Sequence, residues 1–257
     1  MQSAIFAQIF TDGMKLIIDI GNTTRKYYFF EGKELTGEVH SEEHPSVGFI
    51  EALQREHGPF SSAVLSTVVS LGVDFVKGLQ QMMPLLIFDQ KTRLPLTNLY
   101  STPATLGPDR LAAAVAGHAM FPGSPVLVID AGTCIKYDLV KDDAYHGGII
   151  APGIRMQAKA LHTFTDRLPL VNPDPGMECP LTGASTTGSI LSGIINATVA
   201  SMEGIIARYM DENPGLMIIL SGGDLNYFDK RLKYSIFALP NLVAAGLNEI
   251  LDFNEST

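Results

Sequence analysis

Leu16-Ile17-Ile18-Asp19-Ile20-Gly21-Asn22-Thr23 recurs half a chain later as Leu127-Val128-Ile129-Asp130-Ala131-Gly132-Thr133. In both copies an apolar strand runs into aspartate, one more residue, glycine and a small polar side chain. A lysine follows each copy, Lys26 in the first and Lys136 in the second. A repeat at this spacing indicates a duplicated domain, because the repeats of solenoid proteins are much shorter.

The repeated turn also predicts a chemistry. Glycine lets the backbone turn tightly, so that amide N–H groups can face an anion. An aspartate at the end of a strand offers oxygen to a hard cation such as Mg²⁺, and asparagine or threonine adds a neutral hydrogen bond. A single Asp-x-Gly is also a common turn signal. Two copies in matching contexts favour a site that holds a polyphosphate chain and its metal between two domains.

The composition is that of a folded protein. The 257 residues suffice for one large domain or two medium ones, and 46% apolar with 18% charged residues argues against disorder. The net charge of −9 argues against nonspecific nucleic-acid binding, which needs a basic surface. It does not exclude phosphate ligands, because backbone amides and a few local cations can hold those.

The cysteines and the apolar stretches indicate a cytoplasmic protein. Cys134 and Cys179 are the only cysteines and neither belongs to a CxxC pair, so we expect reduced thiols and no zinc site. We expect no membrane span, because no apolar stretch reaches the roughly 18 residues that one needs. Residues 1–13 lack the pattern of a secretory signal, and we expect an N-terminal extension ahead of a strand that opens at Met14.

Hydrophobic patterns predict alternating strands and helices. We expect a strand meander over 15–40, helices at 47–57, 72–83, 110–120, 153–163, 189–210 and 241–252, strands at 62–69, 85–88 and 216–220, and irregular loops at 94–107 and 164–180. The predicted domains are 14–122 and 123–257. Each opens with a meander and continues with α/β alternation. This is typical of two ribonuclease-H-like domains that clasp ATP, as in actin-like proteins, sugar kinases and the Hsp70 ATPase.

Residues 19–26 are the first candidate site. The Gly21-Asn22-Thr23 turn can wrap phosphate oxygens, with a hydroxyl from Thr23 and a positive charge from Lys26. The alternative is a surface hairpin with a solvated lysine. Lys26 can also point away from the turn, because successive residues of a strand face opposite ways.

Gly107-Pro108-Asp109-Arg110 is the second candidate site, at the end of a long loop of the kind that is more often functional than filler. Asp109 either caps the helix that begins here or accepts the proton of a substrate hydroxyl. A helix N-terminus lowers the basicity of a carboxylate, but phosphoryl transfer depends more on positioning than on base strength. Arg110 can pair with a substrate carboxylate.

Two further candidate segments come from the second half of the chain. Asp130 can hold a cation and Thr133 a phosphate, while Cys134 is interpreted as a packing residue rather than a nucleophile. Ser221-Gly222-Gly223-Asp224 follows a buried strand. Its paired glycines either let the planar ring of a nucleoside approach the backbone or form a plain turn.

These segments, in this order, resemble type III pantothenate kinases, the family related to the Bvg accessory factor, over nearly the whole chain from Met14. Asp19 to Thr23 with Lys26 is similar to the first phosphate motif of the family, and Asp130 to Thr133 to the second. Tyr100 with Gly107-Pro108-Asp109-Arg110 is similar to its pantothenate motif. Further similarities are Gly147-Gly148-Ile149-Ile150-Ala151-Pro152-Gly153, Thr186 seven residues before Gly193, and the adenosine segment Ser221-Gly222-Gly223.

The resemblance implies ATP-dependent phosphorylation of pantothenate to 4'-phosphopantothenate, the first step of coenzyme A biosynthesis, by a homodimer. Asp109 would be the catalytic proton acceptor, Asp130 would bind a monovalent cation (K⁺ or NH₄⁺), and Mg²⁺ would come with ATP. The implied pantothenate contacts are Tyr100, Gly107, Pro108, Asp109, Arg110 and Thr186, with Thr186 a candidate for the neighbouring subunit's site. The implied ATP contacts are Asp19, Ile20, Gly21, Asn22, Thr23, Thr24, Arg25, Lys26 and Thr133.

Two departures from the family pattern and two alternative functions stay open. Cys134-Ile135-Lys136 stands where the family often has small residues and threonine, and Pro108 occupies a variable position. The alternatives are a kinase for another small metabolite, or an ATP-binding accessory or regulatory protein without turnover. The Gly-Pro-Asp-Arg segment with a tyrosine ahead of it favours a substrate with a carboxylate. The presence of Asp109 with both turns favours a live enzyme.

Overall fold

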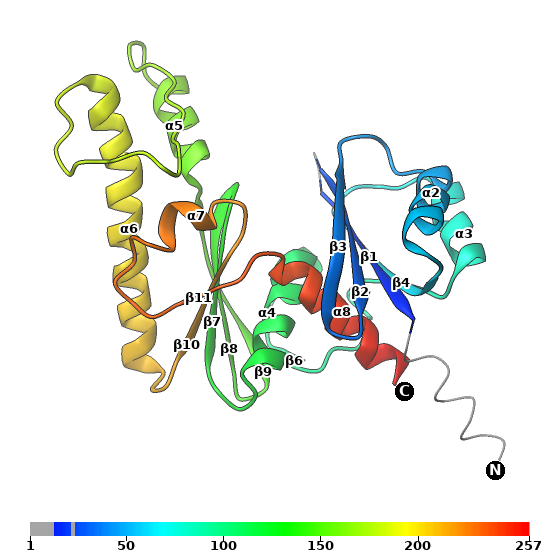
Figure 1. Cartoon of the computed structure of the whole chain (residues 1–257). Coiled ribbons are helices and arrows are strands. Elements are labelled where there is room, and N and C mark those ends of the chain that lie inside the picture. The colour runs from blue at the N-terminus through cyan, green and yellow to red at the C-terminus, as the bar shows by residue number, and fades with distance from the viewer. Residues whose placement is uncertain (1–12, 22–23, 257) are drawn as a thin grey trace. The chain divides into compact units, whose positions relative to one another are not determined.

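The structure is a computed structural model that describes residues 13–21 and 24–256 (Figure 1). Its strands are β1 (Met14–Ile20), β2 (Arg25–Glu31), β3 (Glu34–Ser41), β4 (Phe60–Thr67), β5 (Leu85–Ile87), β6 (Thr97–Asn98), β7 (Val126–Ala131), β8 (Cys134–Lys141), β9 (Ala144–Pro152), β10 (Met217–Ser221) and β11 (Phe237–Ala238). Its helices are α2 (Val47–His57), α3 (Val73–Met82), η1 (Pro103–Thr105), α4 (Pro108–Met120), α5 (Ile154–Thr163), α6 (Thr186–Glu212), α7 (Leu225–Phe228) and α8 (Leu242–Glu255).

Two sheets repeat one topology. Their strand orders are β3-β2-β1-β4-β5 and β11-β10-β7-β8-β9-β6. β1 pairs antiparallel with β2 and parallel with β4, while β7 pairs antiparallel with β8 and parallel with β10. The first sheet therefore matches the series β9-β8-β7-β10-β11 strand for strand. The duplicated ribonuclease-H-like fold that the repeated turn predicts is confirmed.

The chain divides into two compact units. The first comprises Met1–Leu96, Ser101–Ala116 and Val243–Thr257, and the second Thr97–Tyr100 and Gly117–Leu242. The predicted domains, 14–122 and 123–257, differ from these units chiefly in the last helix, α8, which joins the first unit.

One face of the first sheet packs against α2 and α3, which lie together on it (Figure 1). Alternate residues of each strand point to this face, and apolar side chains occupy those positions. The buried residues of this core are Leu16, Ile18, Ile20, Tyr27, Phe29, Ile50, Leu53, Phe60, Ala63, Leu65, Phe75, Leu79 and Met83.

Contacts with the first sheet and with α4 explain why α8 belongs to the first unit. Lys15, which is 6% exposed, forms an ion pair with Asp252 of α8. Asn248 Nδ2 donates a hydrogen bond of 2.9 Å to the Gly32 carbonyl. Gly246 lies directly on α4, since a Cβ there would come within 1.8 Å of the Ala112 carbonyl oxygen. The sequence pattern shows an amphipathic helix here but not these distant partners.

The second sheet packs against α6, the long helix drawn in yellow in Figure 1. Leu127 and Ile129 of β7 share a core with Ile194 and Met202 of α6. On the opposite face of the sheet, Gly117 of α4 lies against β7, where a Cβ would come within 3.0 Å of the Val128 side chain. The end of α4 that belongs to the second unit therefore lies on the face of this sheet opposite α6.

Helix α6 bears on the expectation that no segment spans a membrane. Among the residues that the structure describes, it is the one helix long and apolar enough to cross a membrane by length and composition, with a mean hydropathy of 1.5 over its window. Glycine, serine and threonine interrupt its apolar run, so the helix contains no unbroken apolar stretch of the length that was considered above. The core helix of a folded domain passes the same test, and 39% of this window is buried.

The predicted helices and the longer strands are confirmed to within a few residues. The structure adds β6 and η1 inside the predicted loop at 94–107, and it adds α7 and β11. These elements have two to four residues, too few to show a hydrophobic period.

Candidate functional site

The first Asp-x-Gly turn joins β1 to β2 and places Asp19 opposite Lys26. The two residues are direct cross-strand partners in the antiparallel ladder, so their side chains share one face of the sheet. Burial, followed by the charges of Asp19 and Glu38, raises the pKa of Tyr28, which lies on that same face. The register therefore settles the open question about Lys26 in favour of the side that carries Asp19.

Two other residues of this segment make hydrogen bonds, Gly21 through its backbone and Arg25 through its side chain. The Gly21 N–H donates to the Thr24 carbonyl at 3.0 Å, which closes the turn. Arg25 is 9% exposed and its Nη1 donates to the Glu42 carbonyl at 3.0 Å. Asn22 and Thr23, both predicted ATP contacts, lie outside the described residues.

The Gly107-Pro108-Asp109-Arg110 segment begins α4, within the first unit. Asp109 lies in the first turn of the helix, and its Oδ1 approaches Gly107 so closely that a Cβ there would come within 2.5 Å. Arg110 is 6% exposed. Burying a guanidinium costs several kcal/mol, so its burial here indicates a partner or a ligand. The closeness of Asp109 to Gly107 gives a physical reason for glycine at that position.

The second Asp-x-Gly turn joins β7 to β8 and repeats the arrangement of the first. Asp130 and Lys136 are direct cross-strand partners, and Lys136 Nζ lies 2.7 Å from Asp130 Oδ2. The Gly132 N–H closes the turn on the Cys134 carbonyl at 2.9 Å, and Thr133 is exposed. The central strand of each sheet thus ends in one turn with an Asp–Lys pair.

The turn after β10 packs against the second Asp-x-Gly turn. Ser221 is the parallel partner of Asp130, and the Asp224 N–H donates to the Ala131 carbonyl at 2.9 Å. Gly222 has a φ of +96°, and a Cβ there would lie 2.2 Å from the Ala131 oxygen and 2.5 Å from Asp130 Oδ1. Only glycine fits both the backbone angle and the space.

The start of α5 packs against the same turn. The Gly153 N–H donates to the Thr133 carbonyl at 3.1 Å, and a Cβ at Gly153 would come within 2.0 Å of the Gly132 oxygen. In the second unit, therefore, the ends of β7, β9 and β10 gather backbone amides, glycines and the carboxylates of Asp130 and Asp224 at a single edge. The carboxyl ends of strands at such an edge are where open α/β sheets bind ligands.

An ion pair that sequence reasoning missed reinforces this edge. Arg155, in the first turn of α5, donates to the carboxylate of Asp224, and this hydrogen bond raises the pKa of the arginine. Asp224 is 1% exposed. The available signal was an aspartate directly after a predicted buried strand and two glycines, which is a poor place for an unpaired charge.

Tyr100 belongs to the second unit and lies on Gly147. A Cβ at Gly147, where φ is +87°, would come within 3.0 Å of the Tyr100 ring. The ring centroid is 6.0 Å from that of Tyr145, whose hydroxyl donates to Asp138 at 2.7 Å. The close approach of this aromatic ring explains Gly147. Gly148 is explained by the Tyr137 carbonyl oxygen, which a Cβ there would approach to 1.6 Å.

The predicted pantothenate and phosphate residues fall into two groups. Asp19, Lys26, Gly107, Asp109 and Arg110 belong to the first unit, and Tyr100, Asp130, Thr133 and Thr186 to the second. Thr186 is exposed at the first position of α6, behind the N-cap Ser185, whose side chain accepts from the Gly188 N–H at 3.1 Å.

No group of three or more His, Cys, Asp or Glu side chains gathers into a metal site within residues 13–21 and 24–256. Lys136 Nζ lies at the carboxylate where the resemblance implies a monovalent cation. That cation stays a prediction.

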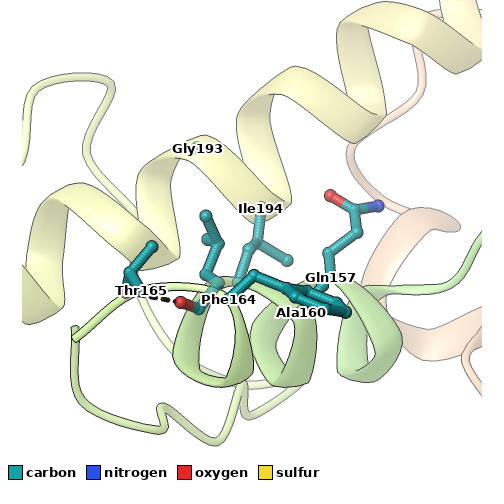
Figure 2. Close-up of a pocket in the computed structure, with 7 residues that line it drawn as sticks. Gln157, Ala160, Phe164, Thr165, Gly193 and Ile194 are labelled. Carbon is teal, nitrogen blue, oxygen red and sulfur yellow. Dashed lines mark hydrogen bonds between the residues drawn. The ribbon is translucent and has the colours of Figure 1, made fainter. Parts of the chain in front are cut away.

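An apolar groove lies elsewhere in the second unit, between α5 and α6 (Figure 2). It has a volume of about 450 Å³ and its lining side chains reach from α5 toward α6, where Gly193 leaves the backbone bare. Phe164, at the end of α5, is 85% exposed. The lining residues are Gln157, Ala160, Leu161, Phe164, Thr165, Gly193 and Ile194.

Comparisons with known proteins give consistent results over the whole chain. The family description type III pantothenate kinase matches residues 15–208. A type III pantothenate kinase of Christiangramia forsetii is 43% identical over 244 residues, which cover 95% of this chain and 100% of that protein. One of Bacteroides fragilis is 43% identical over 243 residues, covering 94% and 98%.

Solved structures share the fold at low sequence identity. A Baf family transcriptional activator from Campylobacter jejuni has a TM-score of 0.61 at 17% identity, covering 94% of this chain and 100% of that one. The activator of the 2-hydroxyisocaproyl-CoA dehydratase from Clostridium difficile, with bound ADPNP, has a TM-score of 0.50 at 10% identity, covering 95% of each chain. At these identities the likeness shows the fold alone.

Proposed function

Because the chain belongs to the type III pantothenate kinase family, and so phosphorylates pantothenate with ATP in coenzyme A biosynthesis, we propose how its residues divide that work. One observation carries the assignment. The central strand of each sheet ends in the same Asp-x-Gly turn, with an aspartate and a lysine as direct cross-strand partners. Each turn brings a glycine and a lysine to the end of a strand, which suits the binding of phosphate oxygens.

In this proposal the two turns bind the phosphates of ATP. The Thr133 hydroxyl and the Lys26 ammonium supply hydrogen bonds and charge to the phosphate oxygens, together with amides of the turns other than those of Gly21 and Gly132, which close the turns. Mg²⁺ that arrives with ATP neutralises charge on the phosphates, and Asp19 is the carboxylate suited to hold it. The remaining residues of the first turn, Ile20, Asn22, Thr23, Thr24 and Arg25, stay predicted contacts.

The nucleoside is proposed to lie at Gly222-Gly223. A Cβ added to Gly223 would meet nothing within 4 Å, so its backbone borders open space. The adjacent carboxylate of Asp130 and the Arg155–Asp224 pair hold this turn in place. A planar ring can approach such a bare backbone closely.

Asp109 is proposed to accept the proton of the pantothenate hydroxyl while that hydroxyl attacks the terminal phosphate. It lies in the first turn of a helix, which fixes its position. A weak base suffices, because a loose transition state depends on alignment more than on proton removal. Arg110 then pairs with the pantothenate carboxylate, with Gly107, Pro108, Tyr100 and Thr186 as further contacts.

A coupled assay of ADP release tests the function itself. With the purified chain, ATP and Mg²⁺, ADP release should require pantothenate and should yield one 4'-phosphopantothenate for each ADP. ATP binding without pantothenate-dependent release would instead favour a regulatory protein.

The predicted homodimer is proposed to form through the groove between α5 and α6. The groove is apolar, Phe164 beside it is 85% exposed, and Thr186, a candidate for the neighbouring subunit's site, lies on the same helix as Gly193. Phe164→Glu should halve the mass measured by sedimentation. Val73→Glu, at a residue of the first unit that is 66% exposed, is the matched control and should leave the mass unchanged.

A further inference from the structure

Lys136 lies where a small cation would otherwise be needed. Its Nζ is 2.7 Å from Asp130 Oδ2, and the side chains of the two residues are 17% and 21% exposed. The contact follows from the register, because Asp130 and Lys136 face each other directly across β7 and β8. A tight turn of two residues, Gly132 and Thr133, separates the strands and keeps the pair in register.

The second carboxylate oxygen is also enclosed. Asp130 Oδ1 lies against Gly222, close enough that a Cβ there would come within 2.5 Å of it. Hard cations need several oxygen ligands around them. With Lys136 on one oxygen and the Gly222 backbone against the other, the donor set left at Asp130 does not fit K⁺.

The Lys136 ammonium group and a free K⁺ or NH₄⁺ also repel each other electrostatically. Lysine carries one positive charge on a compact ammonium group with three donors, which is the charge that K⁺ or NH₄⁺ would bring. A free cation on the same carboxylate would lie next to that ammonium and be repelled by it. The tethered group has the advantage, because it is always present at the site.

We propose that the Lys136 ammonium group takes the place of a monovalent cation at Asp130, so that this kinase works without K⁺ or NH₄⁺. Lys136 is in this sense a positioning residue, since it fixes the charge and orientation of Asp130 beside the proposed phosphate turn. The activity test of this inference rests on the proposed function, whereas its binding test does not.

Activity is measured first in choline chloride and then in KCl or NH₄Cl at equal ionic strength. The wild-type rate should change by less than about twofold. Lys136→Thr should lose at least tenfold in choline and regain most of the loss in KCl, so that a cation requirement appears. Lys136→Arg keeps the charge and should stay independent of KCl, and Lys141→Thr, on the same strand, should behave as the wild type.

Binding is measured without turnover. Crystals soaked in RbCl should show no anomalous peak at Asp130 in the wild type and one in Lys136→Thr. The melting temperature should rise with KCl over choline chloride only in Lys136→Thr, because a ligand that binds the native state alone stabilises it.

Three results would overturn the inference. These are activation of the wild type by KCl of tenfold or more, a Rb⁺ peak bonded to Asp130 in the wild type, and a folded Lys136→Thr protein that gains neither KCl activation nor a Rb⁺ site. An absence of pantothenate phosphorylation in every salt would refute the proposed function instead, and the Rb⁺ and melting experiments would still decide the role of Lys136.

Discussion

The exposed guanidinium of Arg155 forms an ion pair with the buried carboxylate of Asp224. The Arg155 side chain is 59% exposed while that of Asp224 is 2% exposed. Asp224 Oδ2 has no hydrogen-bond partner among residues 13–21 and 24–256, so the arginine contact at Oδ1 matters more. The pair ties the first turn of α5 to the turn after β10.

Removing the arginine should destabilise the protein. Arg155→Met leaves a buried carboxylate without this donor, and we expect the free energy of unfolding in urea to fall by roughly 1–3 kcal/mol. Lys233→Met is the control, because Lys233 pairs with Glu203 at 3.5 Å and its side chain is 63% exposed. That variant should change stability by less than about 0.5 kcal/mol. Equal losses in the two variants would contradict a special role for the buried pair.

Asp109→Asn distinguishes catalysis from helix capping. If Asp109 accepts the hydroxyl proton, kcat should fall by about 10²–10⁴ with modest changes in KM. Asp74→Asn is the control, since Asp74 also lies in the first turn of a helix of the first unit, α3. Both variants should lose similar stability from weaker dipole interactions. A normal kcat in Asp109→Asn would leave capping as its role.

Arg110→Lys tests the pairing with the substrate carboxylate. Lysine keeps the charge but loses the two-pronged geometry, so KM for pantothenate should rise about tenfold or more while KM for ATP changes little. A pantothenate analogue with an amide in place of the carboxylate should bind both proteins equally weakly. If the variant weakened ATP and pantothenate to the same extent, the pairing would be refuted.

Alanine variants of two adjacent glycines, Gly222 and Gly223, test folding and nucleoside binding separately. Gly223→Ala should leave the melting temperature unchanged, because its Cβ meets nothing within 4 Å, but should raise KM for ATP roughly tenfold through a clash of about 1–3 kcal/mol with the base. Gly222→Ala should destabilise the protein more than Gly215→Ala. Both glycines have positive φ, but a Cβ at Gly222 would strike Ala131 while one at Gly215 meets open space.

The buried phenol of Tyr137 should make the free energy of unfolding fall at alkaline pH. Burial raises the pKa of Tyr137 above its ordinary value of 10.0. In the unfolded chain the phenol ionises near pH 10, so the native state keeps its full stability below that pH and loses it as the pH rises toward the higher native pKa. Unfolding in urea from about pH 9 to 12 should show this, with the slope reduced by about 1.4 kcal/mol per pH unit in Tyr137→Phe.

The sequence predicted what depends on local pattern. The two Asp-x-Gly turns gave the duplication, and hydrophobic periods gave the longer helices to within a few residues. The same pattern could not assign α8, because its partners Lys15 and Ala112 are far away in the sequence.

The sequence predicted which segments form the site, but not which atoms of those segments contact one another. The glycines at 147 and 222 stood out in the sequence, but the atoms that demand them, the Tyr100 ring and the Ala131 carbonyl, appear only in the folded chain. Lys136 was visible as a departure from the family pattern. Only the register of β7 and β8 shows that its ammonium group meets Asp130.

The close packing of Gly246 on Ala112 has a consequence for biosynthesis. A ribosome delivers β1 to β5 early, yet the first unit lacks the helix that covers Lys15 until residues 243–257 emerge. The second unit, although translated later, is complete by residue 242. The half of the protein that is made first is thus finished last, and a nascent chain stalled before Gly246 would expose an uncovered sheet face to chaperones.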